Sequence, residues 1–254
     1  MIRHITPIYI IVCVFATLFS HSNALAQSRI EAQQVDFNKQ MRDYGLVDIT
    51  TLDSSILVDL RYSGEDNFLG EDMYGELNRA YLEAEFAKKV VAAQCELRRR
   101  NTNLRLLIYD AARPLSVQRR MRRMVEGTTF ESFVADGTKG GRHNYGVAVD
   151  VTLATEDGTP LDMGTQFDDF SDAAAVKLTP DGSDPATRTV EHYRTDLTKM
   201  QQLGLISAEV VRNRMLLIEV MHSVGLVPYR REWWHFEECI SMTMTRNKYR
   251  LLDF

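Results

Sequence analysis

Two short polar segments, far apart in the chain, constrain the fold more than any other feature of the 254 residues. Residues 143–150 are HNYGVAVD and residues 232–235 are EWWH. Together they supply two imidazoles and a carboxylate, and Glu232 lies three positions before the second histidine. Three such ligands, an open position for water and a further carboxylate to take the water's proton are the components of a catalytic zinc site. The sequence therefore predicts that the two segments meet at one cavity, as in a metallopeptidase.

The spacing within each segment requires a bend. An offset of seven residues would place His143 and Asp150 on opposite faces of an unbroken strand, and Gly146 permits a turn that brings the histidine back. Glu232 and His235, three residues apart, need Glu232 in the turn before a strand, or a bulge between them. A helical HExxH motif is absent from the sequence, which argues against the common helical zinc-protease folds.

Each of these groups also has a plainer explanation. Residues 143–150 alone could be a loop histidine and a salt-bridged aspartate. Arg113, between an expected strand and an expected helix, could form a surface salt bridge rather than stabilise an oxyanion. Trp233 and Trp234 are expected mainly to pack in the core, where they would also keep a nearby site dry.

Hydrophobic periodicity indicates helices interleaved with short strands. Alternation in residues 147–153 places Asp150 between two small neighbours on one face of a strand, which leaves room for an ion. Residues 156–184, rich in Asp, Gly, Thr and Pro, are expected to form a long loop, and residues 27–44 an extended or frayed lead-in. Without a strict βαβ rhythm, this order predicts one α+β domain. The expected helices are residues 81–100, a helix starting at Pro114 and residues 211–224; the expected strands are residues 104–109, 147–153 and 227–237.

The N-terminus has the features of a secretory signal peptide. A short basic start is followed by an apolar run at residues 8–19, and Ala24-Leu25-Ala26 forms a small-x-small cleavage signal. We therefore expect residues 1–26 to be removed and residues 27–254 to form a secreted domain, in the periplasm of a bacterium. An uncleaved anchor is the alternative, although the apolar run is short for a membrane span.

Charge and cysteine content exclude some partners and leave one question open. The formal net charge is −5, so nothing indicates binding to nucleic acid or to an anionic membrane surface. Arginines 119, 120, 122 and 123 are expected to form a solvated helix face rather than a binding patch. Cys95 and Cys239 could form a disulfide in an oxidising compartment or be two buried thiols.

The chain resembles the zinc D-alanyl-D-alanine dipeptidases of the VanX type, peptidase family M15, within the wider D,D-peptidase/Hedgehog-like zinc peptidases. The resemblance extends from about residue 47 to about residue 237 and implies a single α+β domain with a central, mostly antiparallel sheet and flanking helices. It rests on five blocks in the same order: residues 59–62 (DLRY) with 66–70 (DNFLG), 110–114 (DAARP), 143–150, 163–165 (MGT) with 167–168 (FD), and 232–235.

The resemblance implies a role for each matching residue. His143, Asp150 and His235 match the ligands of one zinc ion per chain. Glu232 matches the catalytic base, which takes a proton from water and can later deliver it to the leaving amine. The implied cofactor is therefore Zn²⁺ and the implied reaction is peptide hydrolysis.

Two further residues match groups that bind the substrate, and two depart from the family pattern. Arg113 matches the arginine that polarises the scissile carbonyl and stabilises the oxyanion, and Asp168 matches the carboxylate that receives the free ammonium of the substrate. Gly141 stands where the family usually has a serine that helps bind substrate, and Ala112 where it often has a tyrosine. Both departures are expected beside the pocket, so they leave the hydrolytic groups intact and the preferred dipeptide open.

The leading hypothesis is thus a secreted zinc dipeptidase whose partner is a small dipeptide such as D-Ala-D-Ala, with no stable membrane anchor after cleavage. A D,D- or L,D-carboxypeptidase acting on peptidoglycan stem peptides is an alternative, and the loop at residues 156–184 would discriminate the two by closing the pocket to long stems. A non-catalytic zinc-binding module for wall fragments is a third hypothesis, against which Glu232 and Arg113 count. Because a secreted enzyme cannot reach a cytoplasmic D-Ala-D-Ala pool, scavenging or wall turnover ranks above antibiotic resistance.

Overall fold

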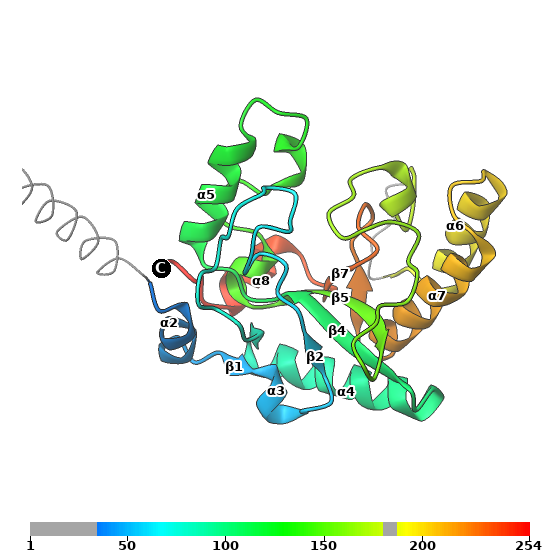
Figure 1. Cartoon of the computed structure of the whole chain (residues 1–254), viewed down its shortest axis with the longest axis horizontal. Coiled ribbons are helices and arrows are strands. Elements are labelled where there is room, and N and C mark those ends of the chain that lie inside the picture. Colours follow the sequence, from blue (N-terminus) through cyan, green and yellow to red (C-terminus); the bar gives the residue numbers. More distant parts are fainter. Residues whose placement is uncertain (1–34, 180–186) are drawn as a thin grey trace, which may run out of the picture. The chain divides into compact units, whose positions relative to one another are not determined.

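A five-stranded sheet forms the centre of the fold (Figure 1). The computed structural model describes residues 35–179 and 187–254. Within the sheet β2 pairs with β4 in parallel, and the other three pairings are antiparallel. This confirms the expected mostly antiparallel sheet. The strand order is β2 (Leu57–Val58), β4 (Leu104–Asp110), β5 (Ala148–Thr155), β7 (His235–Glu238) and β6 (Leu226–Pro228).

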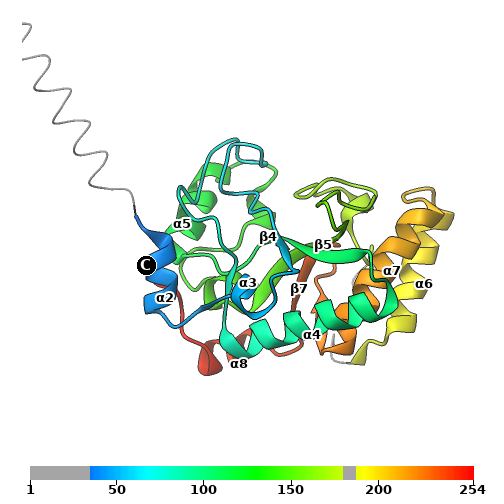
Figure 2. The same ribbon diagram turned by 60° about the horizontal axis from the view of Figure 1, so that its bottom comes forward.

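Helices flank this sheet and confirm the α+β class. The long helices α4 (Ala84–Arg100) and α7 (Ala208–Ser223) contact the sheet and each other, and α6 (Val190–Gln202) packs along α7 (Figure 2). The other α-helices are α2 (Phe37–Asp43), α3 (Ile49–Leu52), α5 (Leu115–Val125) and α8 (Met242–Lys248), and a second sheet pairs β1 (Val47–Asp48) with β3 (Tyr81–Leu82).

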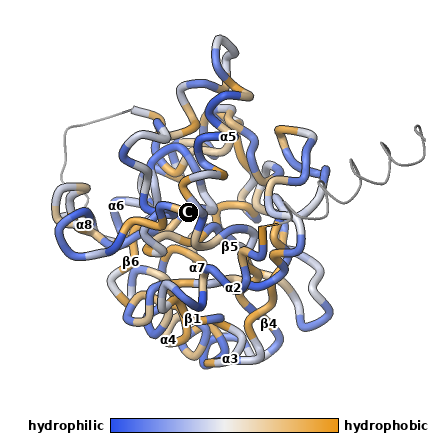
Figure 3. The backbone as a smooth tube through the Cα atoms, turned by 90° about the vertical axis from the view of Figure 1, so that its left-hand side faces the viewer, coloured by the Kyte–Doolittle hydropathy of each residue, from blue (hydrophilic) through white to orange (hydrophobic). Residues whose placement is uncertain are grey.

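The expected alternation along β5 is present. Val149, Val151 and Leu153 are fully buried core residues, and Asp150 points to the opposite face of the strand. The adjacent strand β4 is largely hydrophobic (Figure 3) and almost wholly buried. Both faces of the two central strands are therefore covered, and Asp150 is a charged group within this buried surface.

Some predictions lie outside the described residues. The expected signal peptide, residues 1–26, and the first part of the lead-in fall in residues 1–34, and the last part of the long loop falls in residues 180–186. Residues 37–254 form one compact unit. In residues 35–179 and 187–254, no helix has both the length and the apolar character required to cross a membrane.

The prediction of a single strand at residues 227–237 was wrong. The segment is a hairpin in which β6 and β7 pair antiparallel and residues between them form a turn. The backbone N–H of Tyr229 donates to the carbonyl of His235 at 2.9 Å, and that of Trp233 donates to Ala174 rather than to a strand. Trp233 and Trp234 are buried in this turn, as expected of core residues, so their apolar character resembled that of a strand.

Two further boundaries differ from the prediction. The helix expected from residue 81 begins at residue 84, because residues 81 and 82 pair in β3 and Glu83 caps the helix by accepting two backbone N–H bonds. Part of the expected lead-in is the helix α2, since Met41 is fully buried and Phe37 packs against Phe254. The helices α6 and α8 were not predicted.

The cysteines follow neither prediction. Cys95 is exposed and Cys239 is half-buried, and the two are not joined by a disulfide. The arginines of α5 do lie on a solvated helix face, where Arg120 pairs with Glu71 and Arg122 with Glu131. Two of the four arginines are thus paired with acidic side chains, and Arg119 donates to the carbonyl of Gly137.

Candidate active site

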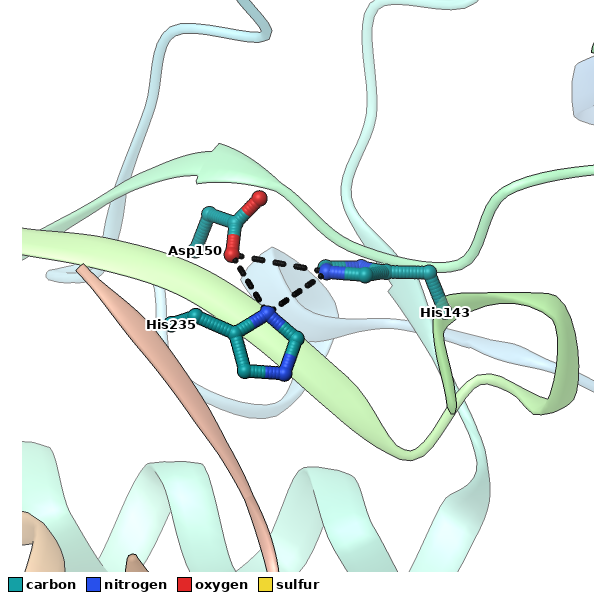
Figure 4. Close-up of side chains that lie close together, drawn as sticks. All are labelled: His143, Asp150 and His235. Atoms are coloured by element: carbon teal, nitrogen blue, oxygen red, sulfur yellow. Dashed lines mark hydrogen bonds and ion pairs between the residues drawn. The ribbon is translucent and has the colours of Figure 1, made fainter. Parts of the chain in front are cut away.

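His143, Asp150 and His235 converge on one point, as Figure 4 shows. The Nε2 atom of His143 lies 3.1 Å from Nδ1 of His235 and 3.4 Å from Oδ1 of Asp150, and the last two atoms are 3.0 Å apart. Tetrahedral ligands with bonds of about 2.0–2.2 Å lie roughly 3.3–3.6 Å from one another. One of the three separations falls in this range and the other two are 0.2–0.3 Å shorter, so a small outward shift of the side chains would place the three atoms as ligands of one small metal ion.

The chain bends before β5, as the spacing requires. His143 lies in a 3₁₀ helix, Arg142–Tyr145, which ends at Gly146 with φ of 68° in the left-handed region. The side chain of Asn144 holds this turn by accepting from the N–H of Gly141 and donating to the carbonyl of Arg113, both at 2.8 Å. The turn redirects His143 toward the face of β5 that carries Asp150, which confirms the predicted bend.

The other nitrogen of each imidazole has an acceptor. Nδ1 of His143 lies 2.7 Å from the carbonyl oxygen of Ala111, and Nε2 of His235 lies 3.1 Å from Oε2 of Glu237. Each contact favours a proton on that nitrogen and a lone pair on the nitrogen that faces the cluster. Glu237 is in turn paired with Arg142 at 2.7 Å. Sequence reasoning missed Glu237, although a carboxylate two positions after His235 lies on the same face of a strand.

The electrostatics of this cluster favour a cation. Burial disfavours ionisation of Asp150, but His143 and His235 lower the pKa of its carboxyl below the usual value. Burial also opposes protonation of His235, yet Asp150 and Glu237 raise its pKa to about 10. The cluster thus attracts positive charge, which either a proton or a metal ion can supply.

Glu232 lies in the turn before β7, as the three-residue offset predicted, and faces the same cavity of about 380 Å³ as the cluster. Burial raises the pKa of its carboxyl to about 7, with the charge of Asp150 adding to the effect and those of His235, His143 and Arg113 opposing it. A group with a pKa near 7 can accept and return a proton at neutral pH. Its position and its pKa both suit a general base.

Arg113 also lines the cavity and is not a surface salt bridge. Its side chain is 11% exposed, and Nε and Nη2 donate to Oδ2 of the fully buried Asp110 at 3.1 and 2.5 Å. Nη1 donates to Gln118 at 2.9 Å, and Tyr74 donates to the other oxygen of Asp110 at 2.6 Å. These contacts fix the guanidinium in one orientation, whereas a solvated arginine samples many. Asp110 and Gln118 were not singled out from the sequence.

Asp168 reaches the cavity from the long loop. Its φ of 61° is unusual for a residue other than glycine. The hydroxyl of Tyr62 donates to both carboxylate oxygens, at 2.9 and 3.1 Å. Burial raises the pKa of Asp168 well above its usual value, and the charges of Asp150 and Glu232 act in the same direction. A cationic group of a ligand would relieve this unfavourable burial.

A buried arginine that the sequence did not reveal holds the loop of Asp168 in place. Arg214 of α7 donates to the carbonyl oxygens of Met163, Ala173 and Ala175, on both sides of Asp168 in the sequence, at 2.5 to 2.9 Å. Burial lowers the pKa of Arg214 to about 9, partly opposed by acidic groups of the loop. The loop is thus anchored to a helix at both ends.

The two departures from the family pattern differ in position. Gly141 lines the cavity, and a Cβ there would lie in ordinary contact with Ala135, at 3.4 Å, so a serine would fit. Ala112 is buried and does not itself line the cavity, although the next residue, Arg113, does. Of the two departures, only the one at position 141 lies on the cavity wall.

Comparison with known proteins gives a consistent result. The sequence profile of peptidase family M15, described as D-ala-D-ala dipeptidase, matches residues 42–249, a span that includes every expected site residue. A D-alanyl-D-alanine dipeptidase of Escherichia coli (strain K12) is 30% identical over 196 residues, covering 76% of this chain and 83% of that protein. A D-alanyl-D-alanine dipeptidase of Synechocystis sp. is 26% identical over 162 residues, covering 52% of this chain and 59% of that protein.

Proposed function

Because the chain belongs to peptidase family M15, the D-ala-D-ala dipeptidases, and is a hydrolase, we propose that it cleaves a small dipeptide such as D-Ala-D-Ala into free amino acids with one zinc ion. The observation that carries the proposal is the convergence of His143, Asp150 and His235, whose ligand atoms lie within 4.8 Å of one another. Glu232, Arg113 and Asp168 line the same cavity.

Two imidazole nitrogens and one carboxylate oxygen suit zinc, which takes nitrogen and oxygen ligands in a tetrahedral arrangement. Three protein ligands leave the fourth position for water or substrate, as in catalytic rather than structural sites. When bound, zinc would supply a Lewis acid that polarises the scissile carbonyl and makes water more acidic. Glu237 and the carbonyl of Ala111 would hold the two imidazoles in the required tautomer.

In the proposed mechanism Glu232 moves the proton. In its ionised form it accepts a proton from the attacking water, and as the protonated acid it delivers that proton to the leaving amine. The raised pKa, about 7, allows both transfers near neutral pH. Because Glu232 is not a member of the metal cluster, its removal should greatly reduce turnover and leave the three proposed ligands in place.

Arg113 and Asp168 bind and orient the substrate. Arg113, held by Asp110, would stabilise the negative charge that develops on the carbonyl oxygen, with little reorganisation because its orientation is already fixed. Asp168 would pair with the N-terminal ammonium. A residue preceding that ammonium would convert it to an amide and leave the buried carboxylate without a cation, which favours free dipeptides over longer peptides.

Release of free alanine, of either configuration, by the purified, zinc-loaded protein tests this proposal, with D-Ala-D-Ala, L-Ala-L-Ala and a stem pentapeptide ending in D-Ala-D-Ala as substrates. We expect release from D-Ala-D-Ala alone. Release mainly from the pentapeptide would support a carboxypeptidase, and release from none of the three would support a binding module. As a control, Glu232→Ala should retain zinc and lose about 10²- to 10⁴-fold in turnover.

We further propose that the protein is secreted to the bacterial periplasm and acts in scavenging or wall turnover. The support is the composition of residues 1–26, with a basic start, an apolar run and a small-x-small site. Determining the N-terminus of the protein isolated from its own cells tests this, and we expect Gln27. Full activity of the unprocessed chain in the cytoplasm would contradict the proposal.

A further inference from the structure

Three arginines line the cavity, and two of them are engaged in ion pairs. Arg113 is paired with Asp110. Arg142 is paired with Glu237 and also donates to Thr245 at 2.7 Å. Arg142 cannot turn to a further anion without leaving Glu237 unpaired, and Arg113, held by Asp110, is already assigned to the oxyanion, so neither is available for a second anionic group of the substrate.

Arg231 is the third, and it has no ion pair among residues 35–179 and 187–254. Its guanidinium carbon lies 3.8 Å from the centre of the Phe133 ring, which is stacked on Phe170 with the ring centres 4.4 Å apart. An aromatic face holds a guanidinium in one plane and leaves its N–H groups free to bind in that plane. Arg231 is therefore a half-buried cation that is already oriented at the cavity.

The acidic groups of the cavity can bind the ammonium end of a dipeptide but not its carboxylate end. The carboxylates of the cavity are those of Asp150, Asp168, Glu232 and Glu237, and they suit a metal ion, a proton and an ammonium. A free dipeptide also ends in a carboxylate, which needs a cation or N–H donors if it is desolvated. Gly141 provides no side-chain hydroxyl for that purpose.

We propose that Arg231 binds the C-terminal carboxylate of the substrate, an inference that rests on the proposed dipeptidase function. A planar guanidinium matches a carboxylate with two parallel hydrogen bonds. Asp168 and Arg231 then recognise opposite ends of the zwitterion, and the distance between them limits the length of the peptide. Arg231 is in this sense a specificity determinant rather than a catalytic group.

The test compares D-Ala-D-Ala with its C-terminal amide, D-Ala-D-Ala-NH₂, which lacks the anionic end. We expect the zinc-loaded protein to prefer the acid by about 10²-fold in kcat/KM, mainly through KM. In Arg231→Gln this ratio should fall to about 1, and in Arg231→Lys it should be partly restored, since the charge returns without the planar pair. Arg123→Gln removes the same charge from an exposed position on α5 and should keep the ratio of the unmodified protein.

A ratio near 1 in the unmodified protein, or an unchanged ratio in Arg231→Gln, would overturn the inference. Calorimetric titration of both ligands into zinc-loaded Glu232→Ala, with and without Arg231→Gln, measures binding without turnover. We expect Arg231→Gln to weaken binding of the acid at least about 10-fold more than binding of the amide. If no dipeptide is hydrolysed but this difference is found, the proposed function fails and the carboxylate site stands; equal weakening of both ligands would refute the site itself.

Discussion

The proposed metal cluster (His143, Asp150 and His235) and the loop that carries Asp168 face the same cavity but are built in different ways. Asp150 and His235 are register partners on β5 and β7, so their positions follow from the regular hydrogen bonds of the sheet. Asp168 lies in a loop whose anchors are side chains, chiefly Arg214 and the indole of Trp233, which donates to Thr165 at 2.9 Å. The proposed chemistry thus depends on the sheet, and the proposed recognition depends on a few side-chain contacts.

The two regions also differ in how they balance charge. In the metal cluster, carboxylates and imidazoles lie in contact and compensate one another. Asp168 and Arg214 are each withdrawn from water, and within residues 35–179 and 187–254 neither has an oppositely charged partner in direct contact. Burial raises the pKa of Asp168 and lowers that of Arg214, which in both cases favours the neutral form. Burial of these two groups opposes folding of the loop, and the ammonium of the proposed substrate would relieve this cost at Asp168.

The largest expected effect comes from the sheet side of this comparison. His143→Ala removes one of three ligands, so we expect loss of stoichiometric zinc and at least about 10³-fold loss of activity. Metal content by atomic emission and D-alanine release measure the two effects. Full zinc occupancy with full activity in this variant would mean that the cluster is not the metal centre.

On the loop side, Asp168→Asn should separate recognition from chemistry. Asparagine tolerates the positive φ but cannot pair with an ammonium, so we expect KM for D-Ala-D-Ala to rise about 10²-fold while zinc content is kept. Steady-state kinetics on the zinc-loaded variant test this. An unchanged KM would show that Asp168 does not receive the ammonium.

The same substitution should increase stability, with a defined pH dependence. A carboxyl whose pKa is raised in the folded state binds its proton more tightly there than in the unfolded chain, where its pKa is about 3.9. The stability of the unmodified protein therefore declines, through this group, as pH rises from about 4 toward the raised value. The Tm advantage of Asp168→Asn should be larger at pH 7 than at pH 4; an advantage that does not change with pH would contradict the burial argument.

Glu237→Gln tests whether a carboxylate that contacts His235, but is not itself a proposed ligand, contributes to zinc affinity. Losing the carboxylate behind His235 should weaken zinc binding about 10- to 100-fold. Competition with a chelator of known affinity measures it, and activity at saturating zinc should be reduced less than occupancy at limiting zinc. An affinity equal to that of the unmodified protein would confine the centre to its three ligands.

The smallest expected effect is on the anchor of the loop. Arg214→Met keeps much of the side-chain volume but removes its hydrogen bonds to three carbonyl groups, so the loop should loosen and KM should rise about 10-fold with kcat and zinc content nearly unchanged. Arg214→Lys should restore part of the KM effect. An N-acetylated dipeptide has no ammonium to pair with Asp168. If its KM rises as much as that of the free dipeptide, or if kcat falls as much as KM rises, the substitution has caused general damage rather than displacement of Asp168.

What could be predicted from the sequence follows the same division. The turn at Gly146 and the place of Glu232 before β7 follow from spacing and strand geometry, which are local properties. Glu237 was within reach of the same reasoning, because strand residues two apart share a face. The hairpin of β6 and β7 was not, since two buried tryptophans in a turn have the pattern of a strand.

The residue that anchors the loop of Asp168 could not be identified from the sequence. Arg214 lies within an ordinary helix, and its partners are backbone carbonyls 39 to 51 residues away, which any residue type could supply. The role of Asp110 could not be predicted either, because a carboxylate three residues before an arginine is common on protein surfaces. Contacts to the backbone and ion pairs buried by distant segments depend on tertiary packing, so local pattern does not reveal them.

The order of the ligands along the chain also has a consequence for biosynthesis. Asp150 and His235 are 85 positions apart, and a ribosome adding about 5–20 residues per second needs roughly 4–17 s to cover that distance. During this interval the nascent chain holds only two of the three proposed ligands, His143 and Asp150. The proposed hydrolytic centre can therefore be completed only after β7 has emerged, which would keep the chain inactive throughout most of its own translation.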